Sequence, residues 1–366
     1  MGDTMITVTK TYLPNKNKYI EKIDEIYDSG WVTNNGQMVK KLEERLEKYL
    51  GVKNLLLVAN GTLALQIAYK LLNLKNKVIT TPFSFVATTS SLVWEGLTPK
   101  FVDINPSTFN IDEISIEGAI DESVSAVLPV HVYGNPCNVE AIEKIAEKYA
   151  LKIIYDASHA FNIRYKEESI LNYGDISVIS FHATKIFHCI EGGALIIKDD
   201  KLYEKAKKMI NFGIIGPEQI ETLGINCKMT EFQAAMGICV LDDYELIESE
   251  RKKAYDIYNS KLHDITLLKS QERNKYSNNN YSYYPILFES EEVLKKVIKE
   301  LNNHSIYPRR YFYPSLNTLN YLDYCKMPMS ESISSRILCL PIYYGLSERE
   351  QNTIISVITK ELYNKQ

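Results

Sequence analysis

The sequence lacks several features that would assign it at once to a class of protein. It has no run of about eighteen apolar residues, so no membrane-spanning helix is expected. None of its six cysteines forms a C-x-x-C pair, which argues against a zinc ribbon or a disulfide framework. It contains neither a Walker A phosphate loop nor the G-x-G-x-x-G fingerprint of dinucleotide-binding proteins. A nicotinamide-dependent oxidoreductase is therefore a poor fit.

The charge is nearly balanced. Lys plus Arg number 42 and Asp plus Glu 46, giving a formal net charge of −4, so a strongly basic nucleic-acid-binding protein is not expected. Hydrophobic residues make up 45% and charged residues 24%, as in ordinary globular proteins. The first 22 residues have no apolar core of the kind found in signal peptides. We therefore expect a cytoplasmic protein with no membrane partner and no nucleic-acid partner.

The first two-thirds of the chain alternates short apolar runs with amphipathic stretches. The runs predict strands at Leu55–Val58, Val78–Thr81, Lys100–Val102, Ala126–Val130, Lys152–Tyr155, Ile176–Phe181 and Ala194–Ile197. The stretches predict helices at Leu63–Leu72, Val86–Trp94 and Val139–Tyr149. Alternation of this kind is typical of an α/β fold with a mostly parallel sheet and helices on both faces.

The alternation is followed by a long charged helix, and beyond that helix the pattern changes. One long charged helix is expected from about Glu231 to Leu262, followed by a strand at Tyr281–Phe288 and helices at Glu291–Asn302 and Ser347–Leu362. The polar stretch Tyr276–Asn280 reads as a surface loop. We predict a large domain over residues 1–240, and a linking helix with a small α/β domain over residues 241–366.

Asn60-Gly61-Thr62 joins an apolar strand to the helix that follows it. The free N–H groups and dipole of a helix start attract a phosphate, and a glycine there lets the backbone approach the anion. Taken alone, the same residues are also explained by a plain turn with a Thr cap.

Asp156 ends the apolar run KIIYDASHA. A carboxylate at the carboxyl end of a parallel strand lies where α/β sheets bind ligands. If it is buried and ionised it needs a cationic partner, such as a protonated pyridine nitrogen. A capping or salt-bridged Asp is the other interpretation. His159 could pair with it on a metal, but no third ligand has a clear spacing.

Ser180-Phe181-His182-Ala183-Thr184-Lys185 follows a predicted strand and precedes Glu191-Gly192-Gly193. A lysine there is well placed to form a Schiff base, for which its amine must be deprotonated. It could also be one more solvated surface lysine. His188 and Glu191 could form a metal pair, again without further ligands. No metal site is predicted.

The three segments are more informative together than singly. An anion-binding turn, a carboxylate and a lysine, all at strand ends, are what pyridoxal phosphate requires for its phosphate, its ring nitrogen and its aldehyde.

The sequence also resembles a known family, the DegT/DnrJ/StrS-type nucleotide-sugar aminotransferases. The resemblance runs from about Tyr12 to Leu362. It is carried by SGWVTNNGQMVKKLEERL, VANGTLALQIA, TTPFSFVATTSSLVWEGLTPKFVDI, LPVHVYGNPCNVEAI, IIYDASHAF, GDISVISFHATKIFHCIEGGALI, LGINCKMTEFQAAMG and RRYFYPSL. It implies the fold-type I, aspartate aminotransferase-like fold of pyridoxal phosphate enzymes, with a mostly parallel seven-stranded sheet and a small C-terminal α/β domain.

The resemblance also implies roles for individual residues. Lys185 would hold the cofactor covalently, Asp156 would pair with its ring nitrogen, and His159 would lie near its phenolic oxygen. The remaining cofactor contacts would come from Gly61, Thr62, Phe85 (stacked on the ring), Ser180 and Asn226. Asn226 and Lys228 would reach the neighbouring subunit's site in an obligate homodimer. Substrate contacts would come from Lys228, Arg309, Arg310, Tyr311 and Tyr313.

TYLPNK and SFHATKIFHCIEGG resemble the branch of the family that makes dTDP-4-amino-4,6-dideoxyglucose. This implies transfer of an amino group from L-glutamate to carbon 4 of dTDP-4-dehydro-6-deoxyglucose, through pyridoxamine phosphate, for a surface polysaccharide or a glycosylated metabolite. The alternatives are the same chemistry at carbon 3, or on a GDP- or UDP-linked keto-sugar. A non-catalytic sugar-nucleotide sensor is a further alternative, against which the intact Lys185, Asp156 and Ser180 argue.

Overall fold

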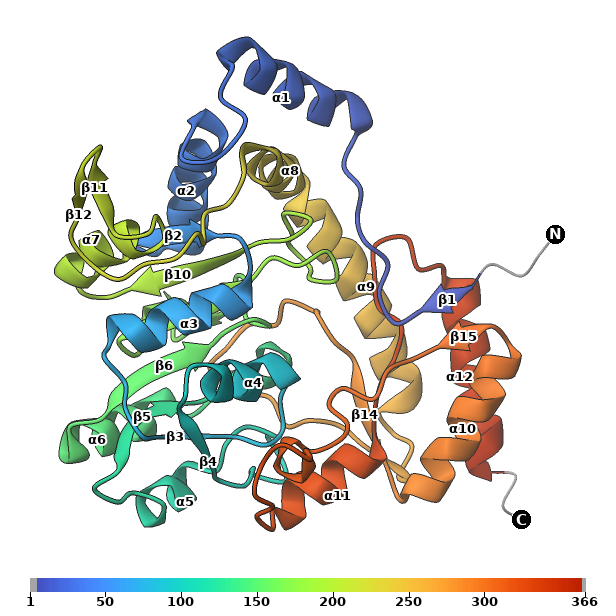
Figure 1. The fold of residues 1–366 in the computed structure, drawn as a ribbon. Coiled ribbons are helices and arrows are strands. Elements are labelled where there is room, and N and C mark those ends of the chain that lie inside the picture. The colour runs from blue at the N-terminus through green and yellow to red at the C-terminus, as the bar shows by residue number, and fades with distance from the viewer. Residues whose placement is uncertain (1–4, 364–366) are drawn as a thin grey trace.

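A computed structural model of the chain describes residues 5–363. Its centre is a seven-stranded sheet in the order β2-β10-β9-β6-β5-β3-β4 (Figure 1). The strands are β2 (Leu55–Val58), β3 (Lys77–Thr80), β4 (Thr98–Phe101), β5 (Val124–Leu128), β6 (Lys152–Asp156), β9 (Ile176–Ser180) and β10 (Gly193–Ile197). All pairs are parallel except those made by β10, which runs antiparallel to β2 and β9. The mostly parallel α/β sheet is confirmed, and strand ends differ from the predicted ones by small shifts.

Alternation along the strands divides the core into two layers. Leu55 and Leu57 of β2 face one layer, which contains residues of α2 (Gln37–Leu50), α6 (Val139–Tyr149) and α8 (Glu231–Asp242). Leu56 and Val58 face the other, with α3 (Gly61–Leu71), α4 (Val86–Trp94) and α7 (Asp200–Met209). Successive side chains of a strand point to opposite faces, so continuous apolar runs are required where both faces are covered.

The single long helix predicted over Glu231–Leu262 is wrong. The structure has α8 and then α9 (Tyr244–Leu262), separated at Asp243, whose ψ of 7° departs from the helical value. α8 is buried almost all round, whereas α9 buries one side only. The Asp243 carboxylate accepts hydrogen bonds from Tyr12 Oη at 2.9 Å and Lys18 Nζ at 3.4 Å. The N-terminal segment therefore packs at the junction.

The C-terminal part forms its own three-stranded antiparallel sheet of β13 (Leu268–Lys269), β14 (Pro285–Phe288) and β16 (Ile337–Cys339). α10 (Glu291–Asn303) and α12 (Glu348–Tyr363) pack beside it, and β1 (Ile6–Thr7) pairs in parallel with β15 (Ile306–Tyr307) (Figure 1). The strand predicted at Tyr281–Phe288 begins only at Pro285. The loop predicted at Tyr276–Asn280 is not wholly at the surface, because Asn280 is buried and donates to the carbonyls of His159 and Phe161.

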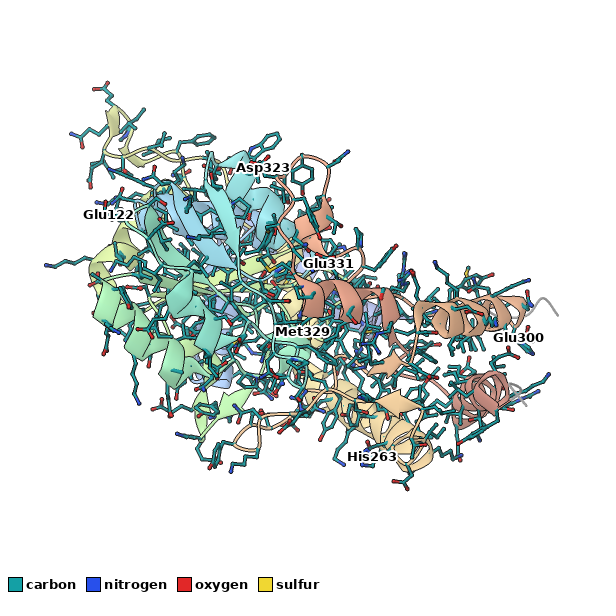
Figure 2. The ribbon with its side chains drawn as sticks, turned by 90° about the horizontal axis from the view of Figure 1, so that it is seen from below. Glu122, His263, Glu300, Asp323, Met329 and Glu331 are labelled. Atoms are coloured by element: carbon teal, nitrogen blue, oxygen red, sulfur yellow. The ribbon has the colours of Figure 1, made fainter. Side chains whose placement is uncertain are left out.

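The two parts of the chain are joined through polar contacts as well as through α9. The first turn of α11 (Pro328–Arg336) points its N–H groups at Asp103, which follows β4. Met329 N and Ser330 N each donate to the Asp103 carboxylate at 2.8 Å, and Figure 2 shows Met329 on this helix. An anionic cap suits the positive end of a helix. The division at residue 240 remains a prediction.

The remaining described α-helices are α1 (Lys16–Ser29) and α5 (Glu113–Gly118). The remaining strands are the short pairs β7 (Arg164–Tyr165) with β8 (Glu168–Ser169) and β11 (Ile214–Gly216) with β12 (Gln219–Ile220). Among residues 5–363, no helix has the length and apolar character needed to cross a membrane.

Candidate active site

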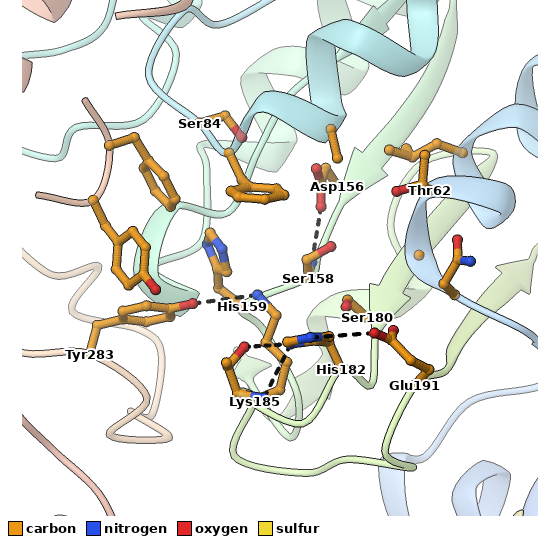
Figure 3. A pocket seen from close by; sticks show the side chains of 18 residues that line it. Thr62, Ser84, Asp156, Ser158, His159, Ser180, His182, Lys185, Glu191 and Tyr283 are labelled. Atoms are coloured by element: carbon orange, nitrogen blue, oxygen red, sulfur yellow. Dashed lines mark hydrogen bonds and ion pairs between the residues drawn. The ribbon is translucent and has the colours of Figure 1, made fainter. Parts of the chain in front are cut away.

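A pocket of about 290 Å³ opens where β2, β6 and β9 end (Figure 3). Residues from both parts of the chain line it: Asn60, Gly61, Thr62, Leu65, Ser84, Phe85, Ala87, Asp156, Ser158, His159, Ser180, His182, Thr184, Lys185, Glu191, Tyr283, Tyr311 and Phe312. This is the edge of a parallel sheet at which α/β proteins bind ligands.

One end of the pocket is the start of α3. The Asn60 side chain caps this helix by accepting from Leu63 N at 2.9 Å. The N–H groups of Gly61 and Thr62 come earlier in the turn and have no partner within the helix. A Cβ added at Gly61 would lie 3.1 Å from the Cβ of Ser180, so glycine permits the close approach of helix and strand that brings the Ser180 hydroxyl beside this turn. Together these donors suit a phosphate.

Asp156 ends β6 and is 5% exposed. Its Oδ2 accepts from Thr88 Oγ1 at 2.7 Å, and its Oδ1 accepts from Ser158 N at 3.1 Å. In the described range no Lys, Arg or His side chain forms an ion pair with it. A buried carboxylate without a cation is expensive, so the pocket is suited to a ligand that brings a positive charge to Asp156.

His159 is buried three residues after Asp156. Its Nδ1 accepts from Tyr133 N at 3.3 Å, and its ring stacks on Phe312 with centroids 5.4 Å apart. Burial, with smaller contributions from Lys185 and His131, holds the pKa of His159 well below its usual value. The imidazole is therefore neutral and, because Nδ1 accepts, its proton is assigned to Nε2. It can donate to an oxygen in the pocket.

Lys185 follows β9 after a tight turn, in which its own N–H donates to His182 O at 2.8 Å. Desolvation lowers the pKa of Lys185 to about 8, against a smaller opposing effect of Asp156. A sizeable fraction of the amine is then neutral near neutral pH, as a nucleophile or a base must be. Lys185 Nζ donates to Tyr283 Oη at 3.4 Å (Figure 3).

The remaining wall and mouth carry aromatic and polar groups. Phe85 lines the pocket and is 55% exposed. His182 Nε2 lies 3.4 Å from Glu191 Oε1, and His182 Nδ1 shares a hydrogen bond with Thr184 Oγ1 at 2.8 Å. Figure 3 shows this polar group beside Ser180. A ligand bound in the pocket would thus meet an aromatic face and a polar rim.

Eight of the residues predicted from the sequence come together in this pocket. They are Gly61, Thr62, Phe85, Asp156, His159, Ser180, Lys185 and Tyr311.

The other predicted residues lie outside the pocket of their own chain. Asn226 is exposed, and Lys228 Nζ donates to Asn211 Oδ1 at 2.8 Å and lies 5.2 Å above the Phe212 ring. Arg310 donates to Glu291 at 2.9 Å and to Ser335 O at 2.8 Å, with its guanidinium 3.5 Å over the ring of Tyr313. The backbone of Arg309 pairs with Cys339.

Sequence reasoning missed Tyr283, Phe312 and Thr88. Tyr283 lies in no segment that the family resemblance marks, Phe312 lies within RRYFYPSL between two residues that were singled out, and Thr88 lies inside a predicted helix. Within residues 5–363, no three His, Cys, Asp or Glu side chains group as a metal ion would require.

Comparison with known proteins gives a consistent result. Residues 14–359 match the model of the DegT/DnrJ/EryC1/StrS aminotransferase family. The dTDP-4-amino-4,6-dideoxy-D-glucose transaminase of Shigella dysenteriae is 43% identical, over 96% of this chain and 98% of the relative. The enzyme of the same name from Escherichia coli is 38% identical over 100% of both chains. The structure of DesI in the presence of its TDP-sugar product superposes with a TM-score of 0.94 at 28% identity, over 99% of this chain and 94% of that one.

Proposed function

Because the chain belongs to the DegT/DnrJ/EryC1/StrS aminotransferase family, we propose that it moves the amino group of L-glutamate to carbon 4 of dTDP-4-dehydro-6-deoxy-D-glucose. The products are dTDP-4-amino-4,6-dideoxy-D-glucose and 2-oxoglutarate. The two relatives named for this amino sugar match nearly end to end, which favours this substrate over a carbon-3 keto-sugar or a GDP- or UDP-linked one.

Pyridoxal phosphate is the cofactor that fits the pocket. Its phosphate would meet the N–H groups of Gly61 and Thr62 and the Ser180 hydroxyl. Its protonated ring nitrogen would be the positively charged partner that the Asp156 carboxylate needs. Phe85 would cover the ring, and His159 Nε2 would donate to the phenolic oxygen. When bound, the group supplies a carbonyl for the amine and a sink for electrons from the substrate carbon.

Lys185 carries out the proton transfers in this proposal. Its ε-amine would hold the cofactor through the carbonyl that the cofactor supplies, and would be free while the amino donor is bound there. The free amine then accepts the proton from the α-carbon of glutamate at Nζ and returns one later in the half-reaction. A pKa of about 8 suits both tasks, because the amine is mostly protonated near neutral pH yet roughly a tenth of it is neutral at pH 7.

A homodimer with shared sites is part of the proposal. Asn226 and Lys228 do not line the pocket of their own chain, and several apolar side chains close to them in the sequence are exposed. These are Phe212, Ile214, Ile215, Ile220, Leu223 and Ile225. Apolar patches of this kind mark protein interfaces, and a second copy of the chain would cover them and bring Lys228 to its partner's substrate.

The observation that carries the proposal is the lowered-pKa amine of Lys185 in the same pocket as the carboxylate of Asp156, which has no ion-pair partner within residues 5–363. The test is the absorbance spectrum of the protein with pyridoxal phosphate, before and after L-glutamate and then the dTDP-keto-sugar. Glutamate should remove the visible band of the lysine-bound cofactor and the sugar should restore it, with NMR of the product placing nitrogen on carbon 4.

Lys185→Ala is the matched control for this experiment. It should abolish turnover, because among residues 5–363 no other lysine of the same chain lines the pocket to hold the cofactor and move the proton. Conversion by glutamate without restoration by this sugar would leave an aminotransferase with another substrate. Normal turnover in Lys185→Ala would overturn the assignment of Lys185.

A further inference from the structure

Tyr283 brings a phenol to the reactive amine of the pocket. Its Oη accepts a hydrogen bond from Lys185 Nζ at 3.4 Å, across 98 positions of sequence (Figure 3). In the described part of the chain no other side chain has a hydrogen bond with this Nζ. Because Tyr283 belongs to a different part of the chain from the lysine, it gives the amine a fixed point outside its own turn.

The ring of Tyr283 is held on several sides. It lies edge-on to His159, with centroids 5.0 Å apart, and packs on Tyr133 at 5.4 Å and Tyr311 at 6.0 Å. Burial raises the pKa of the Tyr283 phenol well above its usual value, so the phenol keeps its proton. A neutral phenol accepts from an ammonium group and donates to a neutral amine. It can therefore partner Lys185 in both protonation states.

Arg251 of α9 holds the segment that carries this tyrosine. It is 4% exposed; its Nε donates to Tyr281 O at 3.1 Å and its Nη2 to Ser282 O at 2.7 Å. No carboxylate of residues 5–363 forms an ion pair with it, and burial lowers the pKa of Arg251 to about 10. A buried cation without an anion is costly, and an apolar side chain could fill the space without that cost. The guanidinium instead fixes the two carbonyls directly before Tyr283.

We propose that Tyr283 is a further catalytic residue, which holds the ε-amine of Lys185 in place whenever that amine is not bonded to the cofactor. Arg251 is a positioning residue that acts through Tyr283. The inference rests on the proposed role of Lys185. A long side chain released in mid-reaction samples many rotamers, and a fixed partner keeps it within reach of the reacting carbon. No covalent bond changes at Tyr283, and it gains and loses no net proton.

The first test uses the full-length protein without cofactor. Acetylation of Lys185 by acetic anhydride is followed against pH by mass spectrometry of its peptide, and the midpoint reports the pKa of the amine. Charge-assisted hydrogen bonds are the stronger ones, so losing the Tyr283 hydroxyl should favour the neutral amine. Tyr283→Phe should lower the midpoint by about half a unit, which is about threefold more neutral amine at a fixed pH.

The second test is the half-reaction with glutamate in a single turnover. Tyr283→Phe should slow it about 10- to 100-fold with no change in glutamate affinity, because the amine is misplaced and not the substrate. Tyr284→Phe is the matched control: it removes a phenol at the next position, whose ring packs on Tyr255 and Tyr258 instead. It should leave both readouts unchanged.

Arg251→Met should reproduce both effects and add nothing in a Tyr283→Phe background, since it acts through the same contact. If Arg251→Met fails to fold, Arg251→Lys, which keeps the charge, takes its place. Its acetylation midpoint and its half-reaction rate should both lie between those of the wild type and those of Tyr283→Phe. Wild-type values for Tyr283→Phe in both tests would overturn the proposal. A wild-type protein that binds no pyridoxal phosphate would instead overturn the proposed function, with the acetylation midpoints still measurable.

Discussion

At the scale of single residues, Asp156 gives the sharpest prediction. Asp156→Asn keeps the shape of the side chain but removes the negative charge, so the pocket no longer favours a protonated ring nitrogen. The half-reaction with glutamate should slow about 100-fold or more, as expected when a charge that stabilises the transition state is lost. The measurement is the single-turnover rate, with the amount of bound cofactor determined separately.

Thr88→Val should slow the half-reaction with glutamate less than Asp156→Asn does. It removes the donor to Asp156 Oδ2 and leaves the carboxylate charged, so it should slow the same step by only about tenfold. Equal effects of the two variants would mean that the hydroxyl and not the charge is what matters at Asp156.

The residues that could be predicted from the sequence are those whose signal is local. Asp156 ends a buried strand and Lys185 follows another within a few positions, and the direction of a strand decides where its end points. Thr88 and Tyr283 carry no such signal, because helix packing and a distant loop bring them to the pocket. One threonine or tyrosine among many has nothing in its neighbours to mark it.

At the scale of elements, α2 stabilises the free edge of β2 with its glutamates. Glu43 Oε1 accepts from Leu57 N and Glu47 Oε1 from Leu55 N, both at 3.0 Å. Such acceptors leave fewer unpaired N–H groups at the edge of the sheet. Burial raises the pKa of Glu43 to about 7, an effect larger than the opposing one of the Leu57 N–H.

This arrangement predicts a pH dependence of stability. The folded state holds a proton on Glu43 up to about pH 7, whereas the unfolded state loses it near pH 4.5. The free energy of unfolding should therefore fall as pH rises from about 4.5 to 7, by roughly 3 kcal/mol at most, and stay level above that. Glu43→Gln, which keeps an oxygen for Leu57 N, should flatten that slope in urea denaturation.

Glu44→Gln is the control for this prediction, because Glu44 is the neighbouring residue on the exposed side of α2. It should leave the slope unchanged. Parallel curves for Glu43→Gln and the wild type would show that Glu43 is ionised in the folded protein at pH 5.

Elements differ in how far the sequence determines them. Apart from the edge strand β4, the strands of the large sheet are largely buried on both faces, so their apolar runs mark them clearly. The break between α8 and α9 carries no glycine or proline, and what distinguishes the two helices is that one is buried all round and the other on one side. That difference depends on packing partners, which the helical periodicity of a single segment does not reveal.

At the scale of the whole molecule, the pocket needs both parts of the chain. Asp156 and Lys185 come from the large sheet, and Tyr283, Tyr311 and Phe312 from segments next to the small one. The contacts that hold these parts together, such as Asp103 with the start of α11, thus also hold the pocket closed on one side. What one chain leaves open is the region that Asn226 and Lys228 would serve in the proposed dimer.

The shared site is tested by mixing two variants that should each lose activity, Lys185→Ala because the reactive amine is gone and Lys228→Ala because the proposed substrate contact is gone. Suppose that Lys228 serves its partner's pocket. In a dimer of one Lys185→Ala chain and one Lys228→Ala chain, the pocket of the Lys185→Ala chain then lacks both lysines, and the pocket of the other chain has both. Random exchange makes about half the dimers mixed, each with one working site, so about a quarter of wild-type activity should return. The mixture is exchanged in mild urea, refolded and assayed beside each variant treated alone.

If Lys228 served its own chain, every site in the mixture would lack one lysine or the other, and mixing would restore no activity. The exposed apolar side chains around Phe212 would then need another explanation than contact with a second copy.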